Sequence, residues 1–382
     1  MRRATVGAIV GLAAFIQGGV AWSATLHVGG GGEYVRIQDA IDAAAPGDTI
    51  RIASGWYSDW TLFEDDPLYA RITKDALTFI GAGADQTFVG PAVYHHEQFH
   101  SSTAFYAKAS WGVQEVAFED LTAINTDLGI RCDGPALRVL RCGVSAAFAG
   151  INASLPLGGD IGACEFHGLE NEFVTGVSLA APSTDVSIAG CIFRDCSFNG
   201  ISHIGSGTVD VFDCQFVHCG TGVQLQAGPT GTISNCTFSG LTGVVLAGWA
   251  SCAIRDCIFE EATNYNLYIS RSALTGLYNV FGGGGRSTIY MEEGPSTVEM
   301  HFSHIFSAGT PYVMCWGFES PPVQTMHLES NYWGINDAAG IYANMELCPN
   351  LAVEVEPLAD GPVPTEAVTW GAVKSLFRDQ GQ

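Results

Sequence analysis

The sequence predicts an all-β fold, a parallel β-helix (a solenoid) of roughly a dozen coils. Three observations lead to this prediction. A cysteine–phenylalanine pattern and a glycine pattern recur with the same period of about 22 residues along the middle of the chain. Each period holds short stretches in which apolar and polar residues alternate, as in Thr232–Asn235, and it holds no helical pattern. Since each coil buries its apolar surface only against its neighbours, the repeats are expected to form one elongated domain.

The first marker is a cysteine followed two residues later by a phenylalanine. It occurs at Cys164, Cys191, Cys214, Cys236 and Cys257, with an earlier related copy at Cys142 and a later one at Asn279. The successive steps are 22, 27, 23, 22, 21 and 22 residues. Because side chains of a strand alternate between its two faces, both residues of each copy are expected to point into the core.

The second marker is a glycine followed by an aliphatic residue. It lies between the copies of the first marker, at Gly129, Gly150, Gly176, Gly200, Gly222 and Gly243, in steps of 21, 26, 24, 22 and 21 residues. Two independent markers with one period predict coils that stack at about 4.8 Å, with ladders of like residues along the axis.

The beginning of the chain has the features of a secretory signal peptide. Arg2 and Arg3 precede an apolar run over residues 6–16, and small residues follow it. These are the charged region, the apolar region and the cleavage zone of such a peptide, which we expect over residues 1–23. The protein is therefore expected to be secreted, periplasmic or on the cell surface.

Further segments flank the repeats. Residues 24–48 are expected to form an N-terminal cap, with a short helix in which Ile37 and Ile41 recur at helical spacing. Such a cap covers the strand edges that a rod exposes at its end. The β-helix is expected over residues 49–350, and a proline-containing linker with a C-terminal tail or cap over residues 351–382.

The composition excludes several classes of protein. Apolar residues make up 47% of the chain and charged residues only 14%, which excludes a disordered chain. There are 16 Lys+Arg against 39 Asp+Glu, a formal net charge of −23, so neither a nucleic acid nor an anionic membrane surface is expected as a partner. No stretch after the signal peptide is long enough to insert into a membrane, and nothing in the sequence indicates an oligomeric state.

The twelve cysteines would ordinarily suggest disulfides in an exported protein. Cysteines in one inward position of successive coils would lie about 4.8 Å apart, whereas a disulfide needs Cβ atoms about 3.8 Å apart. The marker cysteines are therefore expected to be buried free thiols, with a second partial ladder at Cys196 and Cys219. Cys315 and Cys348 lie outside the repeat and are the better disulfide candidates.

Several motifs carry a resemblance to a known superfamily. Gly32–Ile41, Pro46–Ile50 and Leu77–Gly83 together resemble the opening of bacterial right-handed parallel β-helix proteins of the pectin-lyase-like superfamily, and Asn331–Gly334 is similar to a motif near their end. The resemblance covers nearly the whole chain after the signal peptide and implies a right-handed coil. It does not select an activity, because this superfamily includes lyases, glycoside hydrolases, epimerases and proteins with no known chemistry.

The variable part of each coil lies between its cysteine and the next glycine. That distance is 8, 12, 9, 8 and 7 residues, whereas the distance from glycine to cysteine is 13, 14, 15, 14 and 14 residues. Insertions on one face of a solenoid often mark its binding face, which we name the Cys-to-Gly face. Its polar residues are Asn125, Asp127, His167, Glu170, Glu172, Arg194, Asp195, His218, Glu260 and Glu261.

These polar residues are the candidate site residues. The catalytic candidates are Asp195, Arg194, His218, Glu172 and Asp127, and the substrate-binding candidates are Asn125, His167 and Glu261. A stripe of carboxylates with histidine and arginine could hold a polysaccharide and supply a general acid or base. The alternative is that the turns are polar only because they face water.

The resemblance also bears on the chemistry. Asn125-Thr126-Asp127 is similar to the Asn-Thr-Asp element of polygalacturonase-type hydrolases, but their other elements do not follow in this sequence, and a hydrolase needs two carboxylates at one bond. A pectate-lyase-like site needs an acidic cluster for Ca²⁺ and a basic residue, which Asp195, Glu172 and Arg194 could provide. Such a site would take Ca²⁺ as its cofactor, and the sequence does not assign its metal ligands.

The sequence leaves the role of two groups of histidines undecided. His96 and His100 would share a helix face and could bind a metal, but the nearby proline and serines favour a surface loop. His301 and His304 are equally ambiguous.

Two functions follow from the sequence. The first is an exported protein that binds or processes an extracellular polysaccharide, as a lyase or glycoside hydrolase if it is an enzyme. The second is a non-catalytic extracellular rod with a structural or interaction role.

Overall fold

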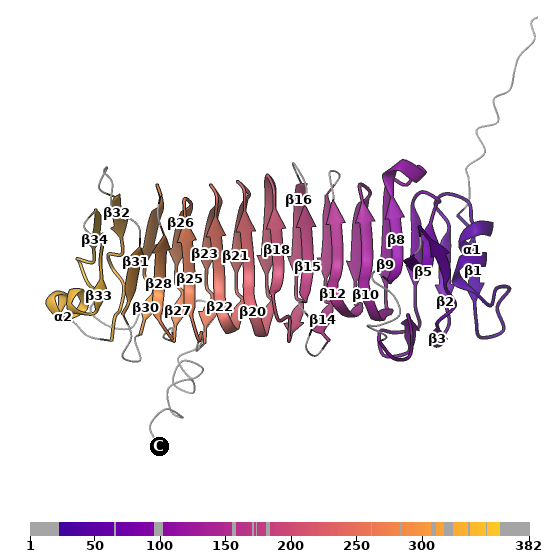
Figure 1. Cartoon of the computed structure of the whole chain (residues 1–382), viewed down its shortest axis with the longest axis horizontal. Helices are drawn as coiled ribbons and strands as arrows, with labels where there is room; N and C mark the ends of the chain where they lie inside the picture. Colours follow the sequence, from indigo (N-terminus) through magenta and orange to yellow (C-terminus); the bar gives the residue numbers. More distant parts are fainter. Residues whose placement is uncertain are drawn as a thin grey trace, which may run out of the picture.

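The structure is a computed structural model. It describes residues 23–359 apart from residues 65, 95–101, 155–157, 170–171, 173, 181–183, 261, 283–284, 293, 307–310, 317–323, 335–336 and 349. The described chain winds into a parallel β-helix, an elongated rod with one short helix at each end (Figure 1). The fold predicted from the repeat is confirmed.

Each coil has three sides. The first side, sheet A, holds fourteen parallel strands that stack in the order of the sequence, so the expected number of coils is also confirmed. Its strands are β1 (Thr25–Val28), β2 (Thr49–Ile52), β6 (Leu77–Ile80), β9 (Glu115–Glu119), β11 (Ala136–Leu140), β13 (Gly159–Gly162), β16 (Thr184–Ala189), β19 (Gly207–Phe212), β21 (Thr230–Ser234), β23 (Ser251–Arg255), β26 (Ala273–Leu277), β29 (Thr297–His301), β32 (Gln324–His327) and β34 (Leu351–Glu354).

Side B follows sheet A in each coil. It is built from β3 (Gly55–Tyr57), β7 (Thr87–Val89), the first part of β10 (Thr122–Asp133) and of β12 (Gly143–Ser154), β14 (Glu165–Gly168), β17 (Ile192–Arg194), the first part of β20 (Gln215–Gln226) and of β22 (Thr237–Ala247), β24 (Ile258–Phe259), β27 (Val280–Phe281) and β30 (His304–Ile305).

Side C closes each coil. It is built from β5 (Asp66–Ile72), β8 (Thr103–Lys108), the second parts of β10, β12, β20 and β22, and β15 (Thr175–Ala180), β18 (Asn199–Ile204), β25 (Tyr265–Ser270), β28 (Ser287–Glu292), β31 (Val313–Trp316) and β33 (Met345–Glu346). One short strand, β4 (Thr61–Phe63), pairs antiparallel with β5. The Cys-to-Gly face is therefore side B together with the corner that joins it to side C.

The two sequence markers meet in one packing contact. Six phenylalanines of side B stack with ring centroids 4.7 to 4.9 Å apart: Phe166, Phe193, Phe216, Phe238, Phe259 and Phe281. A Cβ atom placed on Gly222 would lie 2.4 Å from the ring of Phe238, and one on Gly243 would lie 2.5 Å from the ring of Phe259. The glycine recurs because the phenylalanine of the next coil occupies the space of its side chain.

The marker cysteines form the predicted ladder of buried thiols. Each Sγ atom, from Cys142 to Cys257, donates to the carbonyl oxygen two residues earlier, at 3.2 to 3.3 Å. Ten cysteines are free and buried, Cys196 and Cys219 among them. Burial raises the pKa of the Cys132 and Cys252 thiols to about 12, so these thiols stay protonated at neutral pH.

Towards the C-terminus the same inward position becomes polar. Asn279, Ser303 and Asn331 replace the cysteines, and all three are fully buried. Asn331 accepts a hydrogen bond from the Ser303 amide at 2.8 Å and donates to the carbonyl oxygens of Met300 and Leu328. The side chain thus bridges neighbouring coils, which a thiol does only weakly.

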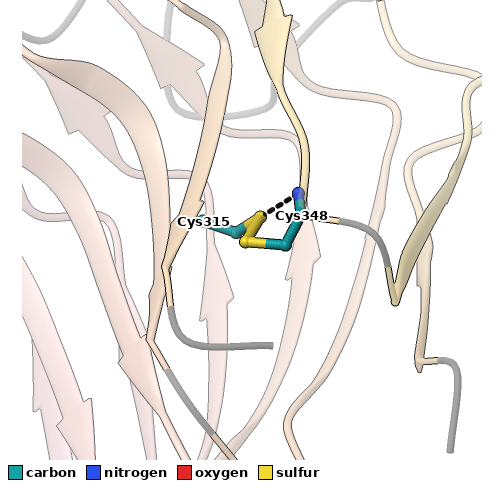
Figure 2. The surroundings of a disulfide bond; sticks show 2 residues. All are labelled: Cys315 and Cys348. Atoms are coloured by element: carbon teal, nitrogen blue, oxygen red, sulfur yellow. Dashed lines mark hydrogen bonds between the residues drawn. A yellow bond between two sulfur atoms is a disulfide. The ribbon is translucent and has the colours of Figure 1, made fainter. Parts of the chain in front are cut away.

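The predicted disulfide between Cys315 and Cys348 is present, and it joins β31 to the segment before β34 (Figure 2). The expected N-terminal helix is α1 (Ile37–Ala43), which buries Ile37, Ala40 and Ile41 against the first coils. A second helix, α2 (Ala338–Ala343), begins at Asp337, whose carboxylate accepts from two amides of the first turn. A single 3-10 turn (Ala109–Trp111) follows β8.

Three expectations concern residues outside the described part of the chain: the signal peptide, the C-terminal tail and the histidines at 95–100. Sheet A already begins at Thr25 within the expected N-terminal cap, and its last strand ends at Glu354.

Candidate functional site

The coil register brings three site candidates together on the Cys-to-Gly face. His167 lies within β14, Asp195 follows β17, and His218 lies within β20, so they occupy three successive coils. Asp195 lies between the two imidazoles: its Oδ2 is 3.5 Å from His167 Nε2 and its Oδ1 is 3.3 Å from His218 Nδ1. We name these residues the His-Asp-His row.

The local backbone explains why these side chains face outwards. Asp195 and His218 both have a φ of 54°, in the left-handed region, at the corner between side B and side C. A single left-handed residue turns the chain sharply, and aspartate and histidine tolerate this conformation better than most residues do. The same corner conformation occurs at Asn125, which has a φ of 55°.

The hydrogen bonds of the row distinguish its two histidines. His167 Nδ1 lies 2.8 Å from the carbonyl oxygen of Gly168 and donates to it, so only the protonated imidazole can also donate from Nε2 to Asp195. His218 faces Asp195 with Nδ1, and this contact leaves Nε2 directed elsewhere. Asp195 therefore orients His218 in the way a carboxylate orients a general base or a hydrogen-bonding imidazole.

The row is well exposed to solvent. The side chains of His167, Asp195 and His218 are 52%, 51% and 74% exposed. Contacts between charged groups at this exposure contribute little to stability, between about 0 and 1 kcal/mol each. The row is thus available to a ligand, and it is not part of the core.

Arg194 does not point at Asp195. Its Nε atom lies 3.0 Å from Glu165 Oε1 of the preceding coil. The proton-abstracting role that a lyase-like site assigns to Arg194 would require this ion pair to open.

Asp127 is surrounded by donors. Its Oδ1 accepts from the Tyr94 hydroxyl at 2.7 Å, and its Oδ2 accepts from the Ser102 amide at 2.6 Å and the Ser102 hydroxyl at 2.7 Å. Asn125 Nδ2 donates to the carbonyl oxygens of Pro91 and Ala92, at 3.1 and 3.2 Å. Both residues of the hydrolase-like element therefore fasten the segment over residues 91–94 to the rod.

Glu172 interacts with residues of both earlier and later coils. Its main-chain carbonyl accepts from the hydroxyl of Ser197, two residues after Asp195. Its charge also acts on Tyr94: burial, the hydrogen bond to Asp127 and the charges of Asp127 and Glu172 all raise the pKa of that phenol. Glu170 and Glu261 lie outside the described residues.

Exposed apolar side chains accompany the polar stripe, and the sequence interpretation missed them. Phe148, Phe198 and Leu241 are 60%, 54% and 49% exposed. Each lies two residues before a marker glycine, and they occur on every second coil, at a spacing on the order of 10 Å. An apolar residue in an otherwise polar turn was the signal that could have identified them.

Other features lie away from this face. Surface depressions are lined by Gly29–Gly32 with Arg51 at the N-terminal end, and by Thr78, Ala117 and Arg138 on sheet A. Neither depression includes a residue of the stripe. A further cluster of metal-ligand type, His327, Glu329 and Glu354, lies at the C-terminal end of sheet A and was also missed from the sequence.

Comparison with known proteins supports the fold. Residues 175–325 match the family model described as "Right handed beta helix region". No curated protein matches the chain. No helix among the described residues is both apolar enough and long enough to span a membrane.

Several solved structures are similar to the chain. An ORF18 protein of Geobacillus virus E2 is 13% identical with a TM-score of 0.42, over 78% of this chain and 56% of that one. The catalytic domain of a GH87 alpha-1,3-glucanase is 11% identical with a TM-score of 0.46, over 81% and 64%. The chain thus spans less than two thirds of these two proteins.

A pectin methylesterase from Aspergillus niger is 16% identical with a TM-score of 0.29, over 92% of this chain and 96% of that one. At such identities a likeness concerns the fold alone. The strand register and the family match over residues 175–325 together identify the fold of the chain as a right-handed parallel β-helix.

Proposed function

We propose that the protein binds an extracellular polysaccharide along the Cys-to-Gly face. The observation that carries this proposal is the His-Asp-His row on three successive coils, with the exposed ring of Phe198 three residues after Asp195. Carboxylates and imidazoles form hydrogen bonds with sugar hydroxyls, and aromatic rings pack against the apolar faces of sugar rings. The face offers both kinds of contact side by side.

The shape of the face suits a long ligand. Polar and apolar contacts recur along the rod at multiples of the coil spacing, so an extended polymer can meet equivalent groups at regular intervals. The main-chain carbonyl of Glu172 also accepts a hydrogen bond from Ser197, beside the row.

Charge favours a neutral polysaccharide. The formal net charge of −23 opposes the approach of a uronic acid polymer, unless Ca²⁺ bridges the two anions. We therefore expect binding to neutral glycans that does not depend on Ca²⁺.

Binding is better supported than cleavage. Catalytic acids and bases are usually desolvated, so that their protonation is adjusted to the reaction, whereas Asp195 is 51% exposed. Arg194 is also engaged with Glu165. A purely structural rod is the second candidate, and the stacked core favours it because the core accounts for the repeats without any ligand.

Export is part of the proposal. A disulfide such as Cys315–Cys348 forms and persists in oxidising compartments outside the cytoplasm. Together with the signal-like residues 1–23, it supports a secreted, periplasmic or cell-surface location.

Affinity electrophoresis and calorimetry on a panel of neutral and uronic polysaccharides, with and without Ca²⁺, test this function. We expect Asp195→Asn and Phe198→Ala each to weaken binding by about tenfold, the effect of losing one good contact. The matched control is Asp185→Asn, which changes an exposed aspartate on sheet A and should leave binding unchanged.

Reducing ends and unsaturated products are measured on the same panel. Cleavage that is abolished by Asp195→Asn would make the protein an enzyme. An absence of binding across the whole panel would leave the structural rod as the function.

A further inference from the structure

We propose that a divalent transition metal ion of the Zn²⁺ class binds among His327, Glu329 and Glu354, at the C-terminal end of sheet A. This site is independent of the proposed polysaccharide function. His327 ends β32, Glu354 ends β34, and Glu329 lies in the corner after β32. The strand register places His327 directly beside Glu354, so two neighbouring coils meet in this cluster.

The spacing of the ligand atoms fits a metal ion. The histidine nitrogen and one oxygen of each carboxylate all lie within 4.8 Å of one another. His327 Nδ1 is 3.2 Å from Glu329 Oε1 and 2.9 Å from Glu354 Oε2. Ligands of a tetrahedral zinc ion with bonds of about 2.1 Å lie about 3.4 Å apart. An ion that replaces the shared imidazole proton therefore needs only small shifts of these side chains.

A second observation concerns the other carboxylate oxygen of Glu329. Glu329 Oε2 is enclosed by the protein and has no hydrogen-bond partner among the described residues, and the Glu329 side chain is only 19% exposed. This oxygen lies 3.7 Å from His301 Nδ1. His301 Nδ1 lies 2.9 Å from the main-chain carbonyl of Glu329 and donates its proton there. An enclosed carboxylate oxygen without a partner is costly, and a bound cation would offset that cost.

The surrounding charges also favour a cation. Glu299 of the preceding coil lies beside His327 in the register of β29 and β32, so a third glutamate neighbours the cluster along the sheet. His301 holds the Glu329 main chain through its hydrogen bond and so fixes the corner from which that carboxylate extends.

The donor set selects the class of metal. Ca²⁺ and Mg²⁺ prefer sites made of oxygen atoms, whereas an imidazole together with carboxylates suits zinc and its neighbours in the first transition row. The side chains of His327 and Glu354 are 41% and 56% exposed, so the ion can enter from solvent and keep a water ligand.

Such an ion would stabilise the end of the rod. Coils at the end have a neighbour on one side only, and the last strands here are β32 and β34. On side C the same end is joined by the Cys315–Cys348 disulfide (Figure 2). The metal would provide a second cross-link, on sheet A.

The test uses the full mature chain after treatment with a chelator. Zn²⁺, Mn²⁺ and Ca²⁺ are titrated by calorimetry, bound metal is counted by mass spectrometry after dialysis, and thermal unfolding is followed with each ion. We expect Zn²⁺ to bind at one equivalent through this cluster and to raise Tm, and we expect Ca²⁺ to have no effect.

Two single variants locate the site. Glu354→Gln and His327→Gln should each weaken Zn²⁺ binding by about tenfold or more and remove the rise in Tm. The matched control His27→Gln changes an exposed histidine of β1, at the other end of the same sheet, and should bind as the unaltered protein does. Glu354 is 56% exposed, so its variant should fold normally.

The proposal is overturned if Zn²⁺ does not bind, if Ca²⁺ binds in its place, or if binding is unchanged in both variants. The last result would mean that any bound zinc lies elsewhere and that the cluster is a proton-linked network of one histidine and its glutamates only.

Discussion

The middle coils and the C-terminal coils of the rod are held together in different ways. From Cys164 to Phe259 the interior repeats the same cysteine and phenylalanine in coil after coil, and adjacent rings lie 4.7 to 4.9 Å apart. From Asn279 onward the inward position is polar, a disulfide joins two segments, and charged residues cluster on sheet A. Where a coil has equivalent neighbours on both sides, apolar packing suffices; at an end, directional bonds and cross-links replace the missing neighbour.

The largest expected effect comes from breaking the phenylalanine stack. Phe216→Ala removes a ring that is 1% exposed and lies between Phe193 and Phe238, so we expect a loss of about 4 kcal/mol in the free energy of unfolding. Denaturant unfolding followed by circular dichroism measures it. Phe198→Ala is the control: it removes a ring that is 54% exposed and should cost less than about 0.5 kcal/mol. Equal losses in both variants would contradict the stacked core.

Removing the disulfide should act mainly on the C-terminal coils. Cys315→Ser combined with Cys348→Ser opens a link between residues 33 positions apart, for which we expect a loss of about 3 kcal/mol. Hydrogen exchange should increase in β31 to β34 and change little in β17 to β22. Exchange that rises uniformly along the rod would show that the end is not a separate unit.

A smaller effect is expected where the two markers meet. Gly222→Ala places a Cβ atom 2.4 Å from the Phe238 ring and 2.7 Å from the Gly243 carbonyl oxygen, which should cost about 2 kcal/mol. In the control Gly162→Ala the nearest atom is the movable Cδ2 of Leu140, at 3.0 Å. Thermal unfolding compares the Tm of the two variants. A Tm of Gly162→Ala as low as that of Gly222→Ala, or lower, would refute the steric explanation.

The smallest effect concerns a polar residue within the apolar middle. His203 is fully buried on side C, between Leu179 and Leu225 of the adjacent coils. Burial lowers the pKa of its imidazole, so the unfolded chain takes up a proton more readily than the folded chain does. Stability should therefore decrease as the pH falls below about 6.5, the ordinary value for histidine.

His203→Leu continues the leucines of the adjacent coils and should reduce this dependence on pH. Unfolding curves of both proteins are compared at pH values from about 8 to about 5, because this range spans the ordinary pKa of histidine. An identical slope in the two proteins would mean that His203 does not contribute to it.

The interior of the middle coils could be predicted from the sequence because one period fixes both register and direction. The steps between Cys214, Cys236 and Cys257 are 22 and 21 residues, so strand alternation alone assigns each side chain to the inside or the outside. For the same reason the spacing placed His167, Asp195 and His218 on one face.

Details of the site could not be predicted in this way. The pairing of Arg194 with Glu165, and the donors around Asp127, depend on side-chain directions and on the path of inserted segments, which a period does not specify. Phe198 was missed because an apolar residue in a repeat is usually part of the core, whereas this one lies at a corner that turns it outwards.

The C-terminal cluster was beyond sequence analysis for a different reason. The steps from Asn279 to Ser303 and from Ser303 to Asn331 are 24 and 28 residues, so the register of His327 and Glu354 could not be counted. The pairing of β32 with β34 is a long-range contact across helix α2 and an inserted segment.

The most direct test of the proposed function is hydrogen exchange of the protein with and without a polysaccharide that it binds. We predict that the ligand protects the corners of the Cys-to-Gly face between Glu165 and His218, where the His-Asp-His row and Phe198 lie, and leaves sheet A and the C-terminal coils unchanged. Protection confined to sheet A or to either end of the rod would contradict binding along the Cys-to-Gly face.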